Sequence, residues 1–562
     1  MIRKTGFVLM VLLISILFFN LEATDRKGVS PSADHTKFAI LNQDFKNPED
    51  VTKACLSCHT EAAREIMKTS HWTWSSESKK VPGKKGKTVK LGKKNALNNF
   101  CISIQANESR CTSCHIGYGW KDKHFDFSDE SKVDCLICHD TTGTYKKFPS
   151  GAGYPVGGNF GNLKGKDSLF FIGNGKTYNK PDYRKISQNI GKPGRNNCGV
   201  CHFYGGGGND VKHGDLDKSL VNPSKKIDVH MAVDGANMQC IDCHYSENHD
   251  IKGQLYSVES ENRNRISCEK CHTENPHTEK LFVEKFDERY NKKLLNKKKP
   301  KVTFDHLLLD RHSKNIACQT CHIPYYSKTY KTKVFWDWSK AGKKFTTGPN
   351  KGKPLVIKDK EGHVTYNGMK GEFKLAKNII PEYFLFSGIA GHVMIDDKID
   401  PNKQPIELNH MYGFCNMGNT KIWPMKVMRG KQPYDPVNKT FIYPKLYGPK
   451  GSGAYWSDFD WKRAAEEGMK YAGKPFSGKV GFVETKMYWP LTHMVAPKED
   501  ALKCSECHSR NGRLKDMKSC WIPGRDKIDI VETLGFLFIL FSLFGVFTHG
   551  LLRIFLGKKF RK

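Results

Sequence analysis

The sequence is short of apolar residues and of acidic residues. Only 38% of its 562 residues are hydrophobic, and its 58 aspartates and glutamates are outnumbered by 91 lysines and arginines. A chain of this length could form several domains, but the low apolar fraction favours a core that bound cofactors complete. The excess of positive charge favours small anions or an acidic redox partner.

Few cysteines are left over for disulfides. Sixteen of the nineteen belong to eight copies of the pattern Cys-x-x-Cys-His, and only Cys101, Cys415 and Cys520 lie outside it. This pattern is the attachment signature of haem c, in which two thiols bind the porphyrin vinyl groups and the histidine becomes the proximal iron ligand. Structural zinc sites pair two cysteine knuckles or add distant histidines, without a fixed histidine after the second cysteine. The sequence therefore predicts eight covalent haem c groups.

The eight motifs define the cofactor-binding residues. The predicted attachment cysteines are Cys55, Cys58, Cys111, Cys114, Cys135, Cys138, Cys198, Cys201, Cys240, Cys243, Cys268, Cys271, Cys318, Cys321, Cys504 and Cys507. The predicted proximal ligands are His59, His115, His139, His202, His244, His272, His322 and His508. Motifs one to seven are separated by 24 to 63 residues, which excludes a regular repeat array. No motif ends in lysine, which disfavours the nitrite reductases that carry Cys-x-x-Cys-Lys.

Seven further histidines have contexts that suit a distal iron ligand. They are His71, His213, His230, His249, His277, His312 and His493. His312 precedes Cys318 by six residues, a spacing that can hand it to a neighbouring haem. The remaining histidines are predicted to be surface or supporting residues: His35, His124, His306, His363, His392, His410 and His549. A haem with two protein ligands carries electrons, whereas one with a displaceable sixth ligand can bind substrate.

The expected fold is a multihaem cytochrome c, mainly α-helical, with extensive irregular loops, a few short strands and a haem-packed core. Residues 24–330 form a haem domain with haems one to seven, and residues 331–500 form a haem-poor lobe that packs on it. In that lobe, Leu355–Lys358 and Val364–Tyr366 are predicted strands and Trp461–Ala472 a helix. Residues 501–527 carry the eighth motif and a linker.

Both ends of the chain predict export and anchoring. Residues 1–23 have the pattern of a signal peptide, with Arg3 and Lys4 before an apolar run. Residues 528–556 contain the apolar stretch Thr533–Leu552, long enough to span a bilayer. The basic tail 557–562 then lies in the cytoplasm by the positive-inside rule. We expect the haem-bearing part on the periplasmic face of a bacterial inner membrane, where nucleic acid is no partner.

The formal charge of +33 falls to about +17 when the two propionates of each ferrous haem are counted. The lysine-rich runs Lys79–Lys94 and Lys292–Lys301 are expected to be solvated surface.

Several segments together resemble one known family. They are FCISIQANESRCTSCHIGYGW, CHDTTGTYKKFPSGAG, GKPGRNNCGVCHFYGGGG, KHGDLD, KVMRGKQPYDPVN and MYWPLTHMVAPKE. With the eight motifs, they are similar to the octahaem tetrathionate reductase family of periplasmic cytochromes, over about residues 35 to 526. The membrane helix departs from the soluble relatives, which leaves the electron donor open: quinol directly, or a cytochrome b partner.

The resemblance implies seven bis-histidine haems and one catalytic haem at the second motif, with His115 proximal and a lysine distal. It matches that lysine to Lys192 of Gly191-Lys-Pro193, with Lys146 and Lys147 as alternatives, and it places Cys101 beside this haem. A neutral lysine amine requires a depressed pKa to bind iron. The implied activity is reduction of tetrathionate, nitrite or hydroxylamine. The alternatives are a non-catalytic electron-transfer cytochrome and a hydroxylamine-oxidoreductase-like enzyme, for which no cross-linking tyrosine is identifiable.

Overall fold

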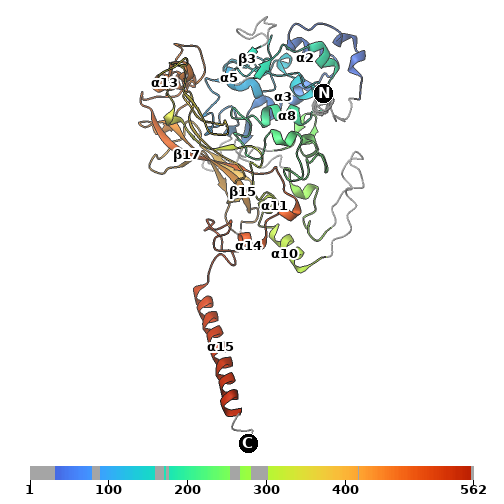
Figure 1. Cartoon of the computed structure of the whole chain (residues 1–562). Coiled ribbons are helices and arrows are strands. Elements are labelled where there is room, and N and C mark those ends of the chain that lie inside the picture. Colours follow the sequence, from blue (N-terminus) through green and yellow to red (C-terminus); the bar gives the residue numbers. More distant parts are fainter. Residues whose placement is uncertain are drawn as a thin grey trace, which may run out of the picture.

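The computed structural model describes residues 32–78, 89–157, 170–172, 176–253, 266–279, 302–415 and 417–557. The predicted signal peptide, residues 79–88 of the first lysine-rich run, the run Lys292–Lys301 and residues 558–562 of the tail lie outside these ranges. Two bodies share the upper part of the molecule, and a single long helix leaves it below (Figure 1).

The helices of the haem-motif region are short. The α-helices are α2 (Pro48–Leu56), α3 (Ala62–Met67), α4 (Ser70–Thr73), α5 (Glu108–Cys111), α6 (Leu136–His139), α7 (Tyr183–Gln188), α8 (Arg195–His202), α9 (Cys240–Cys243), α10 (Phe304–His312), α11 (Cys318–His322), α12 (Tyr455–Asp458), α13 (Trp461–Tyr471), α14 (Cys504–Cys507) and α15 (Asp529–Gly557). Isolated helices of four to nine residues are marginal in water, so this part of the chain depends on tertiary packing. Helix α2 has local support, because Asn47 caps its N-terminus and Pro48 occupies its first turn.

The region between the seventh and eighth motifs forms most of a large mixed sheet. The strands of the molecule are β1 (Ser76–Ser78), β2 (Val89–Leu91), β3 (Phe170–Ile172), β4 (Lys176–Tyr178), β5 (Ser246–Glu247), β6 (Asp250–Ile251), β7 (Thr332–Asp337), β8 (Val356–Lys358), β9 (Val364–Asn367), β10 (Gly371–Ala376), β11 (Glu382–Phe386), β12 (Ile389–His392), β13 (Ile406–Glu407), β14 (Asn409–Tyr412), β15 (Lys421–Asp435), β16 (Thr440–Phe441) and β17 (Gly481–Pro490). The nine-stranded sheet runs β13-β17-β15-β7-β10-β9-β8, with β11 and β16 also paired to β15. The expectation of a mainly α-helical protein is therefore too narrow, since the fold is mixed.

The elements predicted inside the lobe are present. Strands β8 and β9 and helix α13 cover the segments that the sequence indicated. The central element is β15, which pairs with β17, β11 and β16 in antiparallel fashion and with β7 in parallel.

The haem-motif region and the sheet share one hydrophobic core. Leu97, Phe100 and Ile102 pack in the same buried cluster as Trp336 and Trp489 of the sheet. Side-chain amides bond this segment to β15 in both directions: Asn99 donates to the Met428 carbonyl over 2.5 Å, and Gln432 of β15 donates to the Asn98 carbonyl over 2.7 Å. The segment that carries Cys101 is thereby fixed against the sheet.

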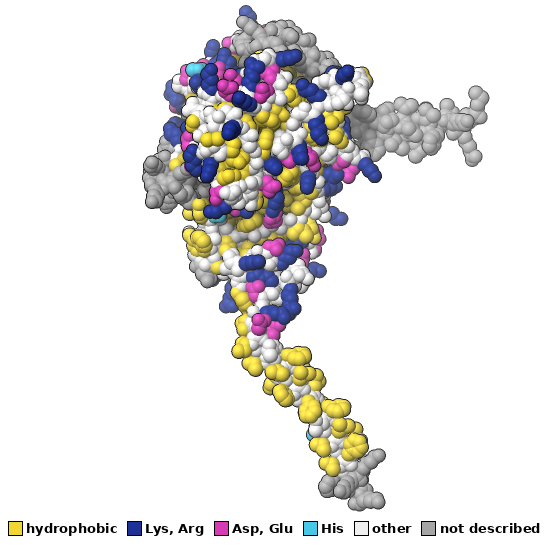
Figure 2. Space-filling model, turned by 90° about the vertical axis from the view of Figure 1, so that its left-hand side faces the viewer, with side chains coloured by type: hydrophobic (Ala, Val, Ile, Leu, Met, Phe, Trp, Pro, Cys, Tyr) yellow, Lys and Arg dark blue, Asp and Glu magenta, His cyan; other side chains and the backbone are white. Residues whose placement is uncertain are grey.

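The base of the molecule connects to the long helix α15. A disulfide joins Cys415, after β14, to Cys520, between α14 and α15, and disulfides persist in oxidising compartments. Helix α15 is apolar enough to cross a membrane by length and composition. Its side chains are almost all hydrophobic, and charged residues gather where it meets the body (Figure 2), where Lys527 and Arg510 pair with Glu532 at 3.1 and 3.6 Å.

Candidate haem-binding sites and the Cys101 pocket

Proximal histidines of the motifs face histidines from elsewhere in the chain. Two imidazoles that bind one iron from opposite sides have ring centres roughly 6 Å apart, because each metal–nitrogen bond is roughly 2 Å and each nitrogen lies roughly 1 Å from its ring centre. Six pairs have this separation: His59 with His35 (6.4 Å), His202 with His71 (6.2 Å), His139 with His249 (6.4 Å), His272 with His230 (6.0 Å), His244 with His493 (6.1 Å) and His508 with His312 (6.0 Å). The side chains therefore fit haem groups at these motifs.

A seventh proximal histidine has a neighbour of the same kind. Burial lowers the pKa of His322, and the charge of His277 lowers it further. His277 is in turn oriented by Asp310, which lies 2.7 Å from its Nδ1. We assign His277 to the seventh motif on this basis.

The ring contacts of the proximal histidines differ from the expected distal set at one member. His35, expected at the surface or in a supporting role, stacks on His59 of the first motif. His213, expected as a distal ligand, is buried, and its ring centre lies 5.0 Å from that of Trp489. No proximal histidine faces His213 among the ring contacts of the described residues. The geometry therefore favours His35 in place of His213.

Most paired histidines have Nδ1 next to an oxygen acceptor, which leaves Nε2 available for a metal. Among the proximal rings, His139, His244 and His508 have the carbonyls of Gly191, Lys252 and Pro523 at 2.8 to 2.9 Å. Among the distal rings, His249 contacts Glu65 at 2.8 Å, and His312 contacts the Leu308 carbonyl at 2.8 Å. Metal-binding histidines typically have such partners, which fix the tautomer and the ring orientation.

Cysteines of different motifs lie against one another, so the motifs form a connected series. Four pairs of cysteines lie close enough for one thiol to lower the pKa of the other: Cys55 and Cys135, Cys114 and Cys201, Cys198 and Cys240, and Cys268 and Cys318. Closeness also raises cysteine pKa values between further motifs: Cys271 acts on Cys243, Cys138 on Cys198, and Cys507 on Cys321. The motifs therefore follow one another in space in the order eight, seven, six, five, four. Motif four adjoins both motif two and motif three, and motif three adjoins motif one.

The second motif differs from the others. Its histidine, His115, is packed among the rings of Trp72, Trp74, Trp120, Phe125 and Phe127. Its Nε2 lies 2.6 Å from the Trp72 carbonyl, and its buried Nδ1 has no partner among the described residues. Burial lowers the pKa of His115 to about 3, which keeps the ring in the neutral, metal-binding form. No second histidine pairs with His115 among the ring contacts of the described residues.

The lysines considered as ligands at this motif have different surroundings. Lys147 is buried, forms an ion pair with Asp134 at 3.0 Å, and donates to the carbonyls of His115 and Gly117. Lys147, an alternative ligand from the family resemblance, thus lies beside His115 with its amine in contact with protein acceptors. Lys146 and Lys192 are exposed. Lys192 follows Gly191, whose carbonyl accepts from His139 of the third motif, and no contact joins Lys192 to His115.

Lys93 was not identified from the sequence. It lies at the end of the lysine-rich run that was expected to be solvated, yet it is only partly exposed, with Nζ 3.9 Å from the centre of the Trp74 ring. Its charge lowers the pKa values of His115, Cys111 and Cys114 of the second motif. The only sequence signal was its position eight residues before Cys101.

Cys101 lies in the same neighbourhood and is surrounded by cations. Burial raises the pKa of its thiol, and Lys370, Lys333, Lys93 and Arg110 oppose that rise. It also raises the pKa of Cys111, which places it close to the second motif. With Cys415 and Cys520 joined and sixteen cysteines assigned to haem, Cys101 is the single free thiol of the chain.

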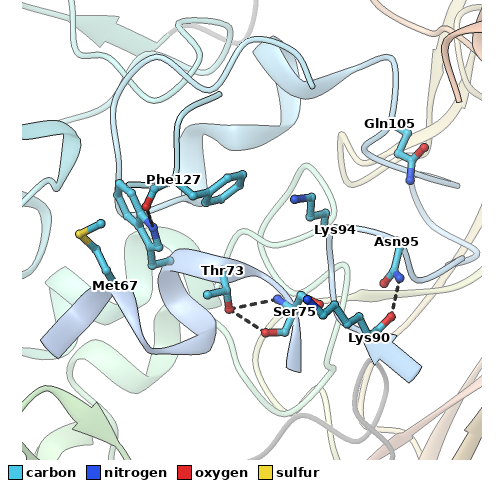
Figure 3. A pocket seen from close by; sticks show the side chains of 9 residues that line it. Met67, Thr73, Ser75, Lys90, Lys94, Asn95, Gln105 and Phe127 are labelled. Atoms are coloured by element: carbon cyan, nitrogen blue, oxygen red, sulfur yellow. Dashed lines mark hydrogen bonds between the residues drawn. The ribbon is translucent and has the colours of Figure 1, made fainter. Parts of the chain in front are cut away.

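A cavity of about 400 Å³ opens beside these aromatic residues (Figure 3). Trp72 and Phe127, which contact His115, form part of its wall, and Lys90, Lys94 and Gln105 contribute polar groups. The surroundings of the second motif thus combine an apolar wall with several positive charges.

The assignment of His35, and not His213, as a distal ligand can be tested directly. We expect His35→Ala to remove the sixth ligand from the first-motif haem, so that one high-spin or water-bound haem is detected by electronic absorption and electron paramagnetic resonance. The matched variant His213→Ala should keep all bis-histidine signals. A new high-spin haem in His213→Ala, with none in His35→Ala, would contradict the assignment.

Comparisons with known proteins agree with this arrangement. A crystal structure of octaheme cytochrome c from Shewanella oneidensis is 41% identical and superposes with a TM-score of 0.72, covering 88% of this chain and 99% of that one. Residues 333–511 match the family model described as Cytochrome c bacterial, and residues 197–273 match the one described as Cytochrome c554 and c-prime. An uncharacterized protein from Archaeoglobus fulgidus is 25% identical over 255 residues, which are 39% of this chain and 80% of the relative.

Proposed function

Because this chain belongs to the octahaem c-type cytochromes, we propose that it is a membrane-tethered periplasmic reductase. It takes electrons from a membrane donor and reduces a small sulfur or nitrogen oxyanion at the second haem motif. Haem groups supply one-electron carriage where both axial positions are filled and substrate binding where one can open. The substrates we propose are tetrathionate, nitrite and hydroxylamine.

The observation that carries this proposal is the exceptional character of the second motif. The other seven proximal histidines each have a histidine neighbour suited to the opposite axial position. His115 has aromatic neighbours instead, together with a free thiol and an excess of lysines. A site with one displaceable ligand and positive charges around it suits an anionic substrate.

The spatial order of the motifs supports a membrane electron donor. The eighth motif lies on α14, near the start of α15 at the base of the body (Figure 1), and the Pro523 carbonyl of the linker accepts from His508. From there the motifs are in contact through seven, six, five and four to two. We propose that electrons from quinol, or from a cytochrome b partner, enter at the eighth motif and leave at the second.

Two other functions remain open to experiment. A pure electron-transfer cytochrome would use the same series of motifs without a substrate, and the unpaired His115 counts against it. A hydroxylamine-oxidising enzyme would require a tyrosine cross-linked to its catalytic haem. Tyr118, three residues after His115, is buried, and its hydroxyl donates to Asp134 over 2.8 Å, which gives it a structural role.

Turnover measurements test the proposed function. The purified, haem-loaded protein with an artificial electron donor should reduce at least one of tetrathionate, nitrite and hydroxylamine. Tetrathionate takes up two electrons as its central sulfur–sulfur bond breaks to give two thiosulfates, and thiols react readily with such bonds. We therefore expect Cys101→Ser to slow tetrathionate reduction and to spare reduction of nitrite and hydroxylamine. An equal loss of activity towards all three substrates in Cys101→Ser would contradict a sulfur-specific role for Cys101. A parent protein that reduces none of the three substrates would rule out the reductase proposal.

A further inference from the structure

Two lysines of the haem-poor lobe point to a role for that lobe in substrate recognition. Lys333 lies on β7, and Lys370 lies in the turn that precedes β10. They are far from Cys101 in sequence, yet their charges are the two largest that lower the pKa of its thiol. The pKa of Lys370 is also affected by Cys111 of the second motif and by Arg110, which directly precedes that motif. The sheet therefore brings two cations to the haem-attachment segment.

Neither ammonium group has a counter-charge from a protein side chain in the part of the chain that the structure describes. Within the described ranges, no carboxylate lies at ion-pair distance from Lys333 or Lys370, and neither Nζ has a hydrogen-bond acceptor. The pKa of Lys333 is lowered to about 7 by burial and then by Lys370, and that of Lys370 is lowered mainly by burial. Both lysines are partly buried. A charge that is partly removed from water without a partner is costly, and such cost is commonly retained at functional sites.

Structural lysines of the same region look different. Lys426 of β15 is fully buried, and its Nζ donates to the Val211 carbonyl over 3.0 Å, to the Lys212 carbonyl over 3.2 Å and to the Thr332 hydroxyl. Lys147 is satisfied in a similar way by Asp134 and two carbonyls. Lys426 and Lys147 are thus both buried and both bonded to acceptors. Lys333 and Lys370 are partly buried, and their Nζ atoms have no acceptor among the described residues.

The walls around the two lysines are aromatic and include an unused donor. The Nζ of Lys333 lies 3.6 Å from the centre of the Phe373 ring and 4.0 Å from that of Trp336. The Nζ of Lys370 lies 5.4 Å from the Trp456 ring, whose buried Nε1 has no acceptor among the described residues. Two ammonium groups and an indole N–H thus offer donors beside one thiol.

We propose that Lys333 and Lys370 bind the sulfonate end of a sulfur oxyanion and present its sulfur–sulfur bond to the Cys101 thiol. The proposal rests on the proposed function for its substrate class and adds the residues that recognise the anion. Trp456 donates to the same sulfonate, and the aromatic rings keep water from solvating the two cations. The haem-poor lobe is then the specificity-determining part of the enzyme.

Alkylation of the free thiol tests the anion site without any turnover. The haem-loaded protein is treated with iodoacetate, which is anionic, or with iodoacetamide, which is neutral, and modification of Cys101 is followed by mass spectrometry. Because both reagents attack the same thiolate, the ratio of their rates reports the local charge. We expect Lys333→Gln with Lys370→Gln to lower the iodoacetate-to-iodoacetamide ratio by about tenfold.

Two variants separate this effect from a general loss of charge or of folding. Lys374→Gln removes an exposed lysine from β10 of the same sheet and should leave the ratio unchanged. Lys333→Arg with Lys370→Arg keeps both charges and should keep the ratio within about twofold. All variants should retain the parental haem spectrum. An unchanged ratio in the double glutamine variant, an equal fall in Lys374→Gln, or a thiol that neither reagent reaches would each overturn the proposal.

The pH dependence of the ratio gives a second readout. Lys333 faces Lys370, Cys101 and Lys426, and its pKa of about 7 means that it is charged below neutral pH and neutral above it. The ratio should therefore fall between pH 6 and pH 9 in the parent and stay flat in the double glutamine variant. If the protein reduces no sulfur oxyanion but the ratio still depends on pH as expected, the anion site is supported and only the proposed substrate is wrong. If the protein reduces a sulfur oxyanion but the ratio does not change with pH, the proposed anion site at Lys333 and Lys370 is wrong.

Discussion

Removal of helix α15 should abolish quinol-driven reduction and leave dye-driven reduction intact. The truncation is best made after Lys527, because Arg525 belongs to the body: its guanidinium donates to the Leu514 carbonyl over 2.7 Å and also binds the Met517 and Cys520 carbonyls. If α15 tethers the protein as we propose, its loss releases the eighth motif from the membrane surface, so that a lipid-soluble donor no longer reaches it. The measurement is substrate reduction in membranes supplied with quinol, against the same protein supplied with a soluble dye.

A chimaera provides the control for this truncation. An unrelated single membrane span attached after Lys527 restores quinol-driven reduction if tethering is sufficient, and fails to do so if α15 itself contacts a cytochrome b partner. Unchanged quinol-driven reduction by the truncated protein would contradict a role for α15 in electron entry.

Replacement of the lysine that we propose as the distal ligand of the second-motif haem should open one haem out of eight. For Lys192→Ala we expect a new high-spin or water-bound haem, while seven haems keep low-spin spectra. Small ligands such as nitrite should bind more readily because no amine has to leave. Anion turnover should nevertheless fall by about 10²-fold, since a released ammonium no longer stabilises charge on the substrate.

Lys93→Ala is the matched comparison, because the charge of Lys93 acts on His115 whereas Lys192 is exposed next to the third motif. If Lys192→Ala keeps the parental spectrum and Lys93→Ala yields the open haem, Lys93 is the ligand and the residue inferred from family resemblance is wrong. Lys147→Ala should instead destabilise the protein, since it leaves the buried Asp134 carboxylate without its cation.

The haem motifs could be identified from the sequence because each is a short local pattern. Which distal histidine serves which haem could not be predicted. Each attachment motif is five consecutive residues, but the pairing of His71 with His202 or of His249 with His139 joins segments more than a hundred residues apart. His35 was expected at the surface or in a supporting role because no pattern surrounds it in the sequence, and its ring stacks on that of His59. His312, by contrast, was expected to serve a neighbouring haem, and its ring faces His508 of the eighth motif.

The sheet was underestimated for a physical reason. Strand β15 contains Pro424 and Pro433, and proline normally argues against a central strand because it cannot donate to a ladder. Side-chain amides add bonds between β15 and the segment before Cys101, because Asn99 donates to the Met428 carbonyl of β15 and Gln432 of β15 donates to the Asn98 carbonyl. The cluster of lysines around Cys101 could not be predicted from the sequence either. Lys93, Lys333 and Lys370 look like solvated charges until the fold brings them to one thiol.

Near-infrared magnetic circular dichroism of the fully oxidised protein, combined with the haem count from intact-protein mass, tests the central claim most directly. Histidine–histidine and histidine–lysine ligation give distinct charge-transfer bands. We expect eight haems, seven of them bis-histidine and one, attached through Cys111 and Cys114, with a different sixth ligand. Eight bis-histidine haems would contradict a substrate site at the second motif and would leave an electron-transfer cytochrome.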